Sequence, residues 1–164
     1  MEQASQIEIM KGASSVLYGS GALNGVIALT EKEPGPKGKL KAKIQSGIYD
    51  NPRRASMKWW DRNPTFHLAD LYYGKSSKNL GFTIGANAYL DSGFRKEESE
   101  ERYRLNGTFY FKPERNKKLK AGLSYNAQYQ DMGVFVLWKN DSMGYEPQDN
   151  TIDRQKSIRL SVDP

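Results

Sequence analysis

Closely spaced glycines between residues 12 and 25 raise the question of a phosphate-binding loop. Gly19-Ser20-Gly21 begins the G-x-G pattern of a dinucleotide-binding turn, but Asn24 stands where that pattern needs its third glycine. No Gly-Lys-Ser or Gly-Lys-Thr follows, as a P-loop requires, and the segment continues into a strand-like run rather than a helix. The sequence therefore predicts tight turns here and no nucleotide site.

Residue types that support metal or nucleophilic chemistry are scarce. His67 is the only histidine and cysteine is absent, so a thiolate zinc site or a histidine pair cannot form. The acidic run at 97–101 lacks the Asp-x-Asp-x-Asp-Gly spacing of a calcium loop, and no Gly-x-Ser-x-Gly elbow is present. We therefore expect no enzyme activity, no metal site and no cofactor.

Large aromatic residues gather in two stretches whose composition is typical of loops. Trp59 and Trp60 are adjacent within 50–66, and Phe135, Trp138 and Tyr145 lie within 131–156. One interpretation is that these five residues line a ligand vestibule. The alternatives are that the rings pack against neighbouring loops, and that the Trp59–Trp60 pair anchors the chain at a membrane interface.

The chain is basic, with 25 Lys+Arg against 19 Asp+Glu and a formal charge of +6. Lysines cluster within 37–43 and 112–120, and acids cluster within 97–101. A nucleic-acid interface would gather the basic residues into one stripe with aromatic residues interleaved. We expect the charged runs to be solvated strand ends and loops, and we expect no nucleic-acid partner.

Apolar and polar residues alternate with a period of two from residue 39 onward. The alternating segments are 39–49, 67–73, 80–91, 102–112, 118–130 and 157–162. In the clearest of them, Leu80, Phe82 and Ile84 alternate with Gly81 and Thr83. This pattern predicts a mainly β fold with about six antiparallel strands in an up-and-down meander, each with one apolar face.

Three features favour a transmembrane β-barrel over a soluble sandwich. Several segments have the roughly ten-residue length of a tilted membrane strand. Short connections at 75–79 and 113–117 alternate with long ones at 50–66, 92–101 and 131–156, as periplasmic turns and extracellular loops do. Tyr49, Tyr73, Tyr103 and Tyr129 stand near segment ends, where an aromatic girdle would lie. A soluble β-sheet binding protein and a small porin-like barrel without a plug remain alternatives.

The first 30 residues carry a different pattern. Residues 7–27 read IEIMKGASSVLYGSGALNGVI, a strand, a small-residue turn, a short helical turn and a second strand. A polar stretch with two prolines and two glycines follows at 31–38 and predicts a linker. The expected organisation is therefore 1–30, a linker at 31–38, and the strand-rich part at 39–164.

Residues 7–27 resemble the end of the plug domain of TonB-dependent outer-membrane receptors, whose signature is IEVxKGxxSxLYGSGAxxGVI. By this resemblance, Lys11, Gly12, Tyr18, Gly19, Gly21 and Gly25 shape the plug, and 39–164 is the N-terminal part of the barrel. Since plugged transporters use about 22 strands, we expect the chain to be a fragment of such a receptor.

The resemblance implies a place in the outer membrane of a Gram-negative cell, with the apolar strand faces against lipid. It implies energy-coupled uptake of a scarce extracellular nutrient, such as a siderophore, vitamin, glycan or peptide. The partner would be the TonB–ExbB–ExbD complex, engaged through a TonB box that this chain does not contain.

Overall fold

The computed structural model describes residues 4–11, 25–31, 33–113, 119–133, 138–146 and 154–163. The chain divides into two compact units, Met1–Pro34 and Gly35–Pro164, and each is described by itself. The division falls within the stretch 31–38. No helix among the described residues is long and apolar enough to cross a membrane.

The first unit contains two antiparallel strands, β1 (Ala4–Lys11) and β2 (Gly25–Glu31). Ile9 pairs with Ile27 and Lys11 with Gly25. Gly25 opens β2 with a φ of 142°, a conformation that costs little only for glycine. Of the residues predicted to shape the plug, Lys11 and Gly25 therefore end and begin the paired strands. The others, Gly12, Tyr18, Gly19 and Gly21, lie outside the described residues.

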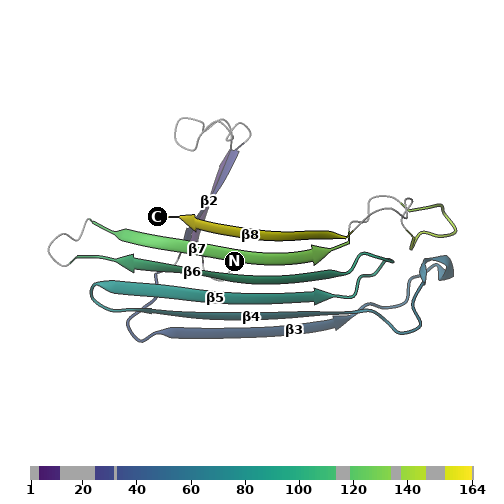
Figure 1. The fold of residues 1–164 in the computed structure, drawn as a ribbon, viewed down its shortest axis with the longest axis horizontal. Helices are drawn as coiled ribbons and strands as arrows, with labels where there is room; N and C mark the ends of the chain where they lie inside the picture. The colour runs from purple at the N-terminus through teal and green to yellow at the C-terminus, as the bar shows by residue number, and fades with distance from the viewer. Residues whose placement is uncertain are drawn as a thin grey trace. The chain divides into compact units, whose positions relative to one another are not determined.

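The second unit is one six-stranded antiparallel sheet in the order β3-β4-β5-β6-β7-β8 (Figure 1). Its strands are β3 (Lys39–Ile48), β4 (Thr65–Ser76), β5 (Leu80–Asp91), β6 (Glu100–Phe111), β7 (Ala121–Met132) and β8 (Gln155–Asp163). A single 3-10 turn, η1 (Ala55–Met57), follows β3 in the described part of the chain. The predicted mainly β, antiparallel meander is confirmed, and each of the six alternating segments forms a strand.

The predicted contrast in connection length is only partly correct. The β4–β5 connection at 77–79 is short, and those at 49–64 and 133–154 are long. The β5–β6 connection at 92–99 is no longer than the β6–β7 connection at 112–120. The reason is that Glu100 and Glu101 pair with Met132 and Asp131, which extends β6, while pairing at the opposite end stops at Phe111 and Ala121. We call the end with 49–64, 92–99 and 133–154 the loop end, and the other the turn end (Figure 1).

The sheet is open: β3 and β8 are edges that pair on one side only among the described residues. Strand register carries one row of apolar residues across all six strands. The row is Ala42, Leu71, Ala86, Leu105, Ala127 and Leu160. The neighbouring row, on the other face, is Lys43, Asp70, Asn87, Arg104, Gln128 and Arg159. We call these two surfaces the apolar face and the polar face.

The apolar face is the more exposed of the two. In β4, the residues from His67 to Lys75 on the apolar face are exposed, whereas those from Phe66 to Ser76 on the polar face are half-buried or buried. Ile44, Ile158 and Leu160 are 84%, 82% and 75% exposed. A sheet that covers its polar side and exposes its apolar side is the reverse of what water favours.

Tyr49 does not lie on the same face as the other tyrosines predicted to form an aromatic girdle. Tyr73, Tyr103 and Tyr129 lie on the apolar face, in register with other residues of that face. Tyr49 follows the end of β3, and its hydroxyl donates to Asp91 Oδ2 at 2.8 Å. Asp91 belongs to the polar set of β5, so this hydrogen bond holds the Tyr49 ring on that side.

Gly81 on the polar face makes room for Tyr110, which is only 7% exposed. A Cβ added at Gly81 would collide with the Tyr110 ring. The ring is also covered by the Lys112 and Lys120 ammonium groups, 5.5 and 4.7 Å from its centroid. The packing of this end of the polar face therefore requires glycine, which has no side chain, at position 81.

We predict that Gly81→Ala lowers the free energy of unfolding by about 1–3 kcal/mol, because the added methyl group displaces Tyr110. Urea titration of the refolded chain in detergent measures the change. Gly35→Ala is the control, since a Cβ there meets no atom within 4 Å. Equal unfolding midpoints for the two variants would contradict this packing.

Candidate ligand vestibule

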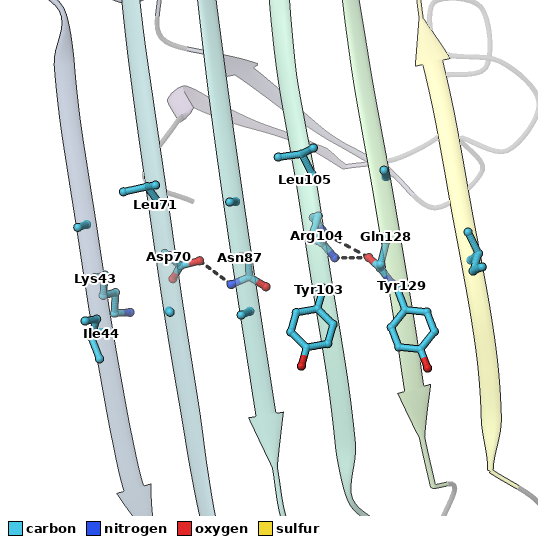
Figure 2. Close-up of a pocket in the computed structure, with 16 residues that line it drawn as sticks. Lys43, Ile44, Asp70, Leu71, Asn87, Tyr103, Arg104, Leu105, Gln128 and Tyr129 are labelled. Carbon is cyan, nitrogen blue, oxygen red and sulfur yellow. Dashed lines mark hydrogen bonds between the residues drawn. The ribbon is translucent and has the colours of Figure 1, made fainter.

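Two concave features are candidates for a binding site, and the larger lies on the apolar face. It is a hollow of about 680 Å³ in the middle of the sheet (Figure 2). Alanines make its floor because they leave room between larger side chains: Ala42, Ala69, Ala86, Ala88 and Ala127. Ile44, Leu71, Leu105, Tyr103 and Tyr129 stand around them. The hollow offers apolar contact alone, which suits hydrocarbon.

On the reverse side of the same strands, the polar row is cross-linked by hydrogen bonds (Figure 2). Asn87 Nδ2 donates to Asp70 Oδ1. Arg104 donates to Gln128 Oε1 from Nε at 3.0 Å and from Nη2 at 2.7 Å. Gln128 is 8% exposed, and it extends the network by donating a hydrogen bond to Gln130. These hydrogen bonds link neighbouring strands through the polar groups of this row.

The second cavity, of about 540 Å³, lies where the polar face meets the loop end. It is lined by Tyr49, Asp91, Gly93, Phe94, Arg95, Glu98, Glu100, Met132 and Gly133. Aromatic rings, carboxylates and a guanidinium thus converge on one space. Such a mixture binds ligands reversibly, with ring contacts for their apolar parts and hydrogen bonds for their polar parts.

A chain of aromatic rings joins the loops above this cavity. The Tyr49 ring lies 5.6 Å from Phe66 and 5.8 Å from Phe94. Phe94 in turn lies 5.2 Å from Trp60, which meets Trp59 edge-on at 6.0 Å. Trp59 Nε1 donates to the Phe94 carbonyl at 2.9 Å. These contacts hold the loop after β3 against the loop after β5.

Asp91 is the polar centre of the cavity wall. Its Oδ2 accepts from the Tyr49 and Tyr89 hydroxyls at 2.8 and 2.7 Å, and its Oδ1 accepts from the Gly93 amide at 2.8 Å. Burial raises the pKa of the Tyr49 phenol well above its usual 10.0, and the hydrogen bond and charge of Asp91 raise it further. Tyr49 therefore remains a neutral donor throughout the physiological pH range.

Residues 138–146 dock on the loop after β5. The Lys96 amide donates to the Tyr145 carbonyl at 3.0 Å, and Lys96 Nζ lies 3.4 Å from Glu146 Oε1. The Lys139 ammonium donates to Glu146, which holds the pKa of that carboxyl below its usual 4.5, and Lys96 lowers it further. A Cβ at Gly144 would collide with the Met57 side chain, so this segment also reaches η1.

Of the residues predicted to line a vestibule, Trp59, Trp60, Trp138 and Tyr145 are at the loop end but are not among the described residues that line the cavity. Trp60 is buried against Phe94, and Trp59 meets it edge-on. Trp138 is 51% exposed, and Tyr145 is half-buried and holds Lys96 through its carbonyl. Phe135 lies outside the described residues. Of the contacts described for Trp59 and Trp60, none reaches Trp138.

The cavity-lining residues Tyr49, Asp91 and Phe94 were not predicted as site residues from the sequence. Tyr49 and Asp91 fall near the ends of strands that are not neighbours, so only the register of the intervening β4 brings them together. Phe94 follows Gly93, whose φ of +83° bends the chain back over the sheet. The sequence feature that could have pointed to Phe94 is an aromatic residue directly after a glycine in a turn.

The described residues contain no group of three His, Cys, Asp or Glu side chains that could hold a metal ion. Both ring nitrogens of His67 face hydroxyls, with Nδ1 2.9 Å from Ser46 Oγ and Nε2 3.2 Å from Thr65 Oγ1. Comparison of the chain with protein-family models, with curated proteins and with solved structures found no match.

We predict that Tyr49→Phe destabilises the fold by about 1–2 kcal/mol at neutral pH, because Asp91 loses a donor. The raised pKa means that the Tyr49 contribution is complete below pH 10.0 and is lost as the pH rises toward the folded-state value. The difference between wild type and variant in urea midpoint should therefore shrink above pH 10.0. A difference that is constant with pH would argue against this role.

Proposed function

We propose that the chain is part of a TonB-dependent outer-membrane receptor that takes up a scarce nutrient with energy supplied from the inner membrane. In this proposal residues 1–30 are the end of the plug, and the six-stranded sheet is a section of the wall of a transmembrane β-barrel. Two independent supports are the residue pattern of 7–27 and the physical character of the sheet.

The observation that carries the proposal is the exposed apolar face. Burying apolar surface yields roughly 25 cal/mol per Å², and soluble monomers seldom expose apolar patches beyond a few hundred Å². Here exposed aliphatic and aromatic side chains continue across all six strands, from Leu40 in β3 to Val162 in β8. Lipid chains would cover this face without requiring a second protein layer.

The dimensions of the face suit an outer-membrane barrel. On β5 the apolar face runs from Leu80 to Ala88, eight steps that span about 26 Å along the strand. The next row, that of Leu90, also contains His67, Glu101 and Asp131. A tilt of about 40° reduces the apolar span to about 20 Å across the membrane, near the height of the apolar band in such barrels.

Aromatic rings of the apolar face lie on both sides of the central row that contains Ala86 and Leu105. Toward the turn end, Tyr73, Phe82, Phe109 and Tyr125 form a continuous line with centroid separations of 5.7, 6.3 and 6.3 Å. Toward the loop end, Tyr103 and Tyr129 stack at 6.3 Å. The tyrosines among these rings are amphipathic, and such rings favour the interfaces of a bilayer.

The remaining parts take roles that follow from this placement. The polar face would line the aqueous lumen, and the loop-end cavity around Asp91 would contact an extracellular ligand such as a siderophore, vitamin, glycan or peptide. The partner for energy coupling would be the TonB–ExbB–ExbD complex, reached through a TonB box elsewhere in the receptor. The proposed location is the Gram-negative outer membrane.

The two alternative functions require different surroundings for the sheet. A soluble β-sheet binding protein would need a further layer over the apolar face. A porin-like barrel without a plug would use the same strands but gives no role to the paired strands β1 and β2.

We predict opposite outcomes for arginine at two adjacent positions of β6. Leu105→Arg places a charge in the middle of the apolar face and should reduce stability in a bilayer by about 2–4 kcal/mol. Asn106→Arg, on the polar face, should change it little. Urea unfolding of the chain refolded in phospholipid vesicles gives both values. A soluble, well-folded Leu105→Arg variant that no longer binds vesicles would contradict the membrane proposal and favour the soluble alternative.

A further inference from the structure

Asp91 is a half-buried carboxylate of the loop-end cavity that forms no ion pair with the described residues. The hydrogen bonds that it accepts come from neutral donors, the Tyr49 and Tyr89 hydroxyls at 2.8 and 2.7 Å and the Gly93 amide at 2.8 Å. A carboxylate can accept about four hydrogen bonds. These donors therefore fix the side chain in place and leave it able to accept a bond from a ligand.

The other carboxylates of the cavity wall are already paired. Glu98 Oε1 lies 3.4 Å from Arg95 Nη1, and Glu100 Oε1 lies 3.0 Å from Arg102 Nη1. The charges of these two pairs cancel locally. Asp91 is therefore the source of net negative charge in the described part of the wall.

The remaining basic residues that the structure describes at the loop end form no ion pair with Asp91. Arg53, Arg54 and Lys58 of the loop after β3 are exposed, and the described cavity lining does not include them. Parts of the loop after β7 lie outside the described residues. Their sequences, VFVL at 134–137 and PQDNTID at 147–153, contain no lysine, arginine or histidine. The loop-end connections thus leave the charge of Asp91 to be balanced from outside them.

Two aromatic residues line the cavity together with Asp91. The ring centroids of Tyr49 and Phe94 are 5.8 Å apart. An aromatic face attracts a cation within about 6 Å of its centroid, and it also provides apolar contact. An anionic group would be repelled by Asp91. The combination favours a positive group on an apolar body, and the volume of about 540 Å³ suits a small ligand.

We propose that this cavity binds an organic cation, an ammonium group on an apolar body, with Asp91 as its counter-ion and Tyr49 and Phe94 as its ring contacts. The inference rests on the proposed function, in which this cavity contacts the extracellular ligand, and deepens it by naming the charge class of that ligand. Such a group occurs in free amines and on the lysine side chains of peptides, and the experiment includes both.

The test measures the affinity of matched probes for the full chain refolded in detergent, by isothermal titration calorimetry. Phenylalanine amide is cationic, N-acetylphenylalanine amide is neutral and N-acetylphenylalanine is anionic, and all carry the same ring. We expect the cationic probe to bind about 10- to 100-fold more tightly than the neutral one, and the anionic probe to bind most weakly. N-acetylphenylalanyl-lysine amide carries its ammonium group on a peptide side chain. If it binds more tightly than phenylalanine amide, the cation is a peptide's, and the reverse order indicates a free amine.

Two variants with the same change in charge locate the site. Asp91→Asn keeps the shape of the side chain and removes its charge, so it should abolish the preference for the cationic probe and change the affinity of the neutral probe little. Asp141→Asn is the matched control, since Asp141 is exposed at the loop end and is not part of the described cavity lining. It should keep the preference. A preference that survives in Asp91→Asn, or that falls equally in both variants, would overturn the assignment.

The wild-type series decides even if Asp91→Asn does not refold. Equal or tighter binding of the neutral or anionic probe, or no binding of any probe, would overturn the cation proposal and leave the receptor proposal standing. The converse is also distinguishable. A cation preference in a chain whose Leu105→Arg variant is soluble and no longer binds vesicles would support the cation site and contradict the membrane proposal.

Discussion

The antiparallel hydrogen-bond ladder from β3 to β8 is the constraint on which the rest of the structure depends. Side chains alternate faces along a strand, so a slip of one residue in any pair would move a whole strand's apolar residues to the other side. The pairing keeps Ala42 and Leu160 in one row across six strands. Because the register is maintained, the sheet acquires one continuous apolar surface and one polar surface.

Hydrogen bonds and ring packing hold the polar face together. In a membrane, a face with such polar groups must contact water or protein. Arg104 and Gln128 bond directly across β6 and β7, and Tyr110 fits over Gly81. At the loop end, the Asp91 carboxylate accepts hydrogen bonds from two phenol hydroxyls and one amide. These contacts make the polar side compact, whereas described side chains of the apolar side are exposed, which is why we propose that lipid covers that side.

The number and order of the strands could be predicted from the sequence, because alternation with period two depends only on neighbouring residues. The strand ends could not, since the last pairs, such as Ser76 with Gly81, involve residues without a hydrophobic pattern. The cavity was missed for a related reason. Tyr49 and Asp91 meet only through the register of three strands, whereas Trp59 and Trp60 stood out by size and instead pack the loops together.

Spin labelling along β5 tests most directly whether the apolar face contacts lipid. The chain has no cysteine, so single cysteines at Thr83, Ile84, Ala86 and Asn87 give unique labels in the chain refolded in phospholipid vesicles. We predict that labels at Ile84 and Ala86 collide mainly with oxygen, which concentrates in lipid, and labels at Thr83 and Asn87 mainly with a water-soluble nickel chelate. Equal exposure of all four positions to the chelate would contradict the account.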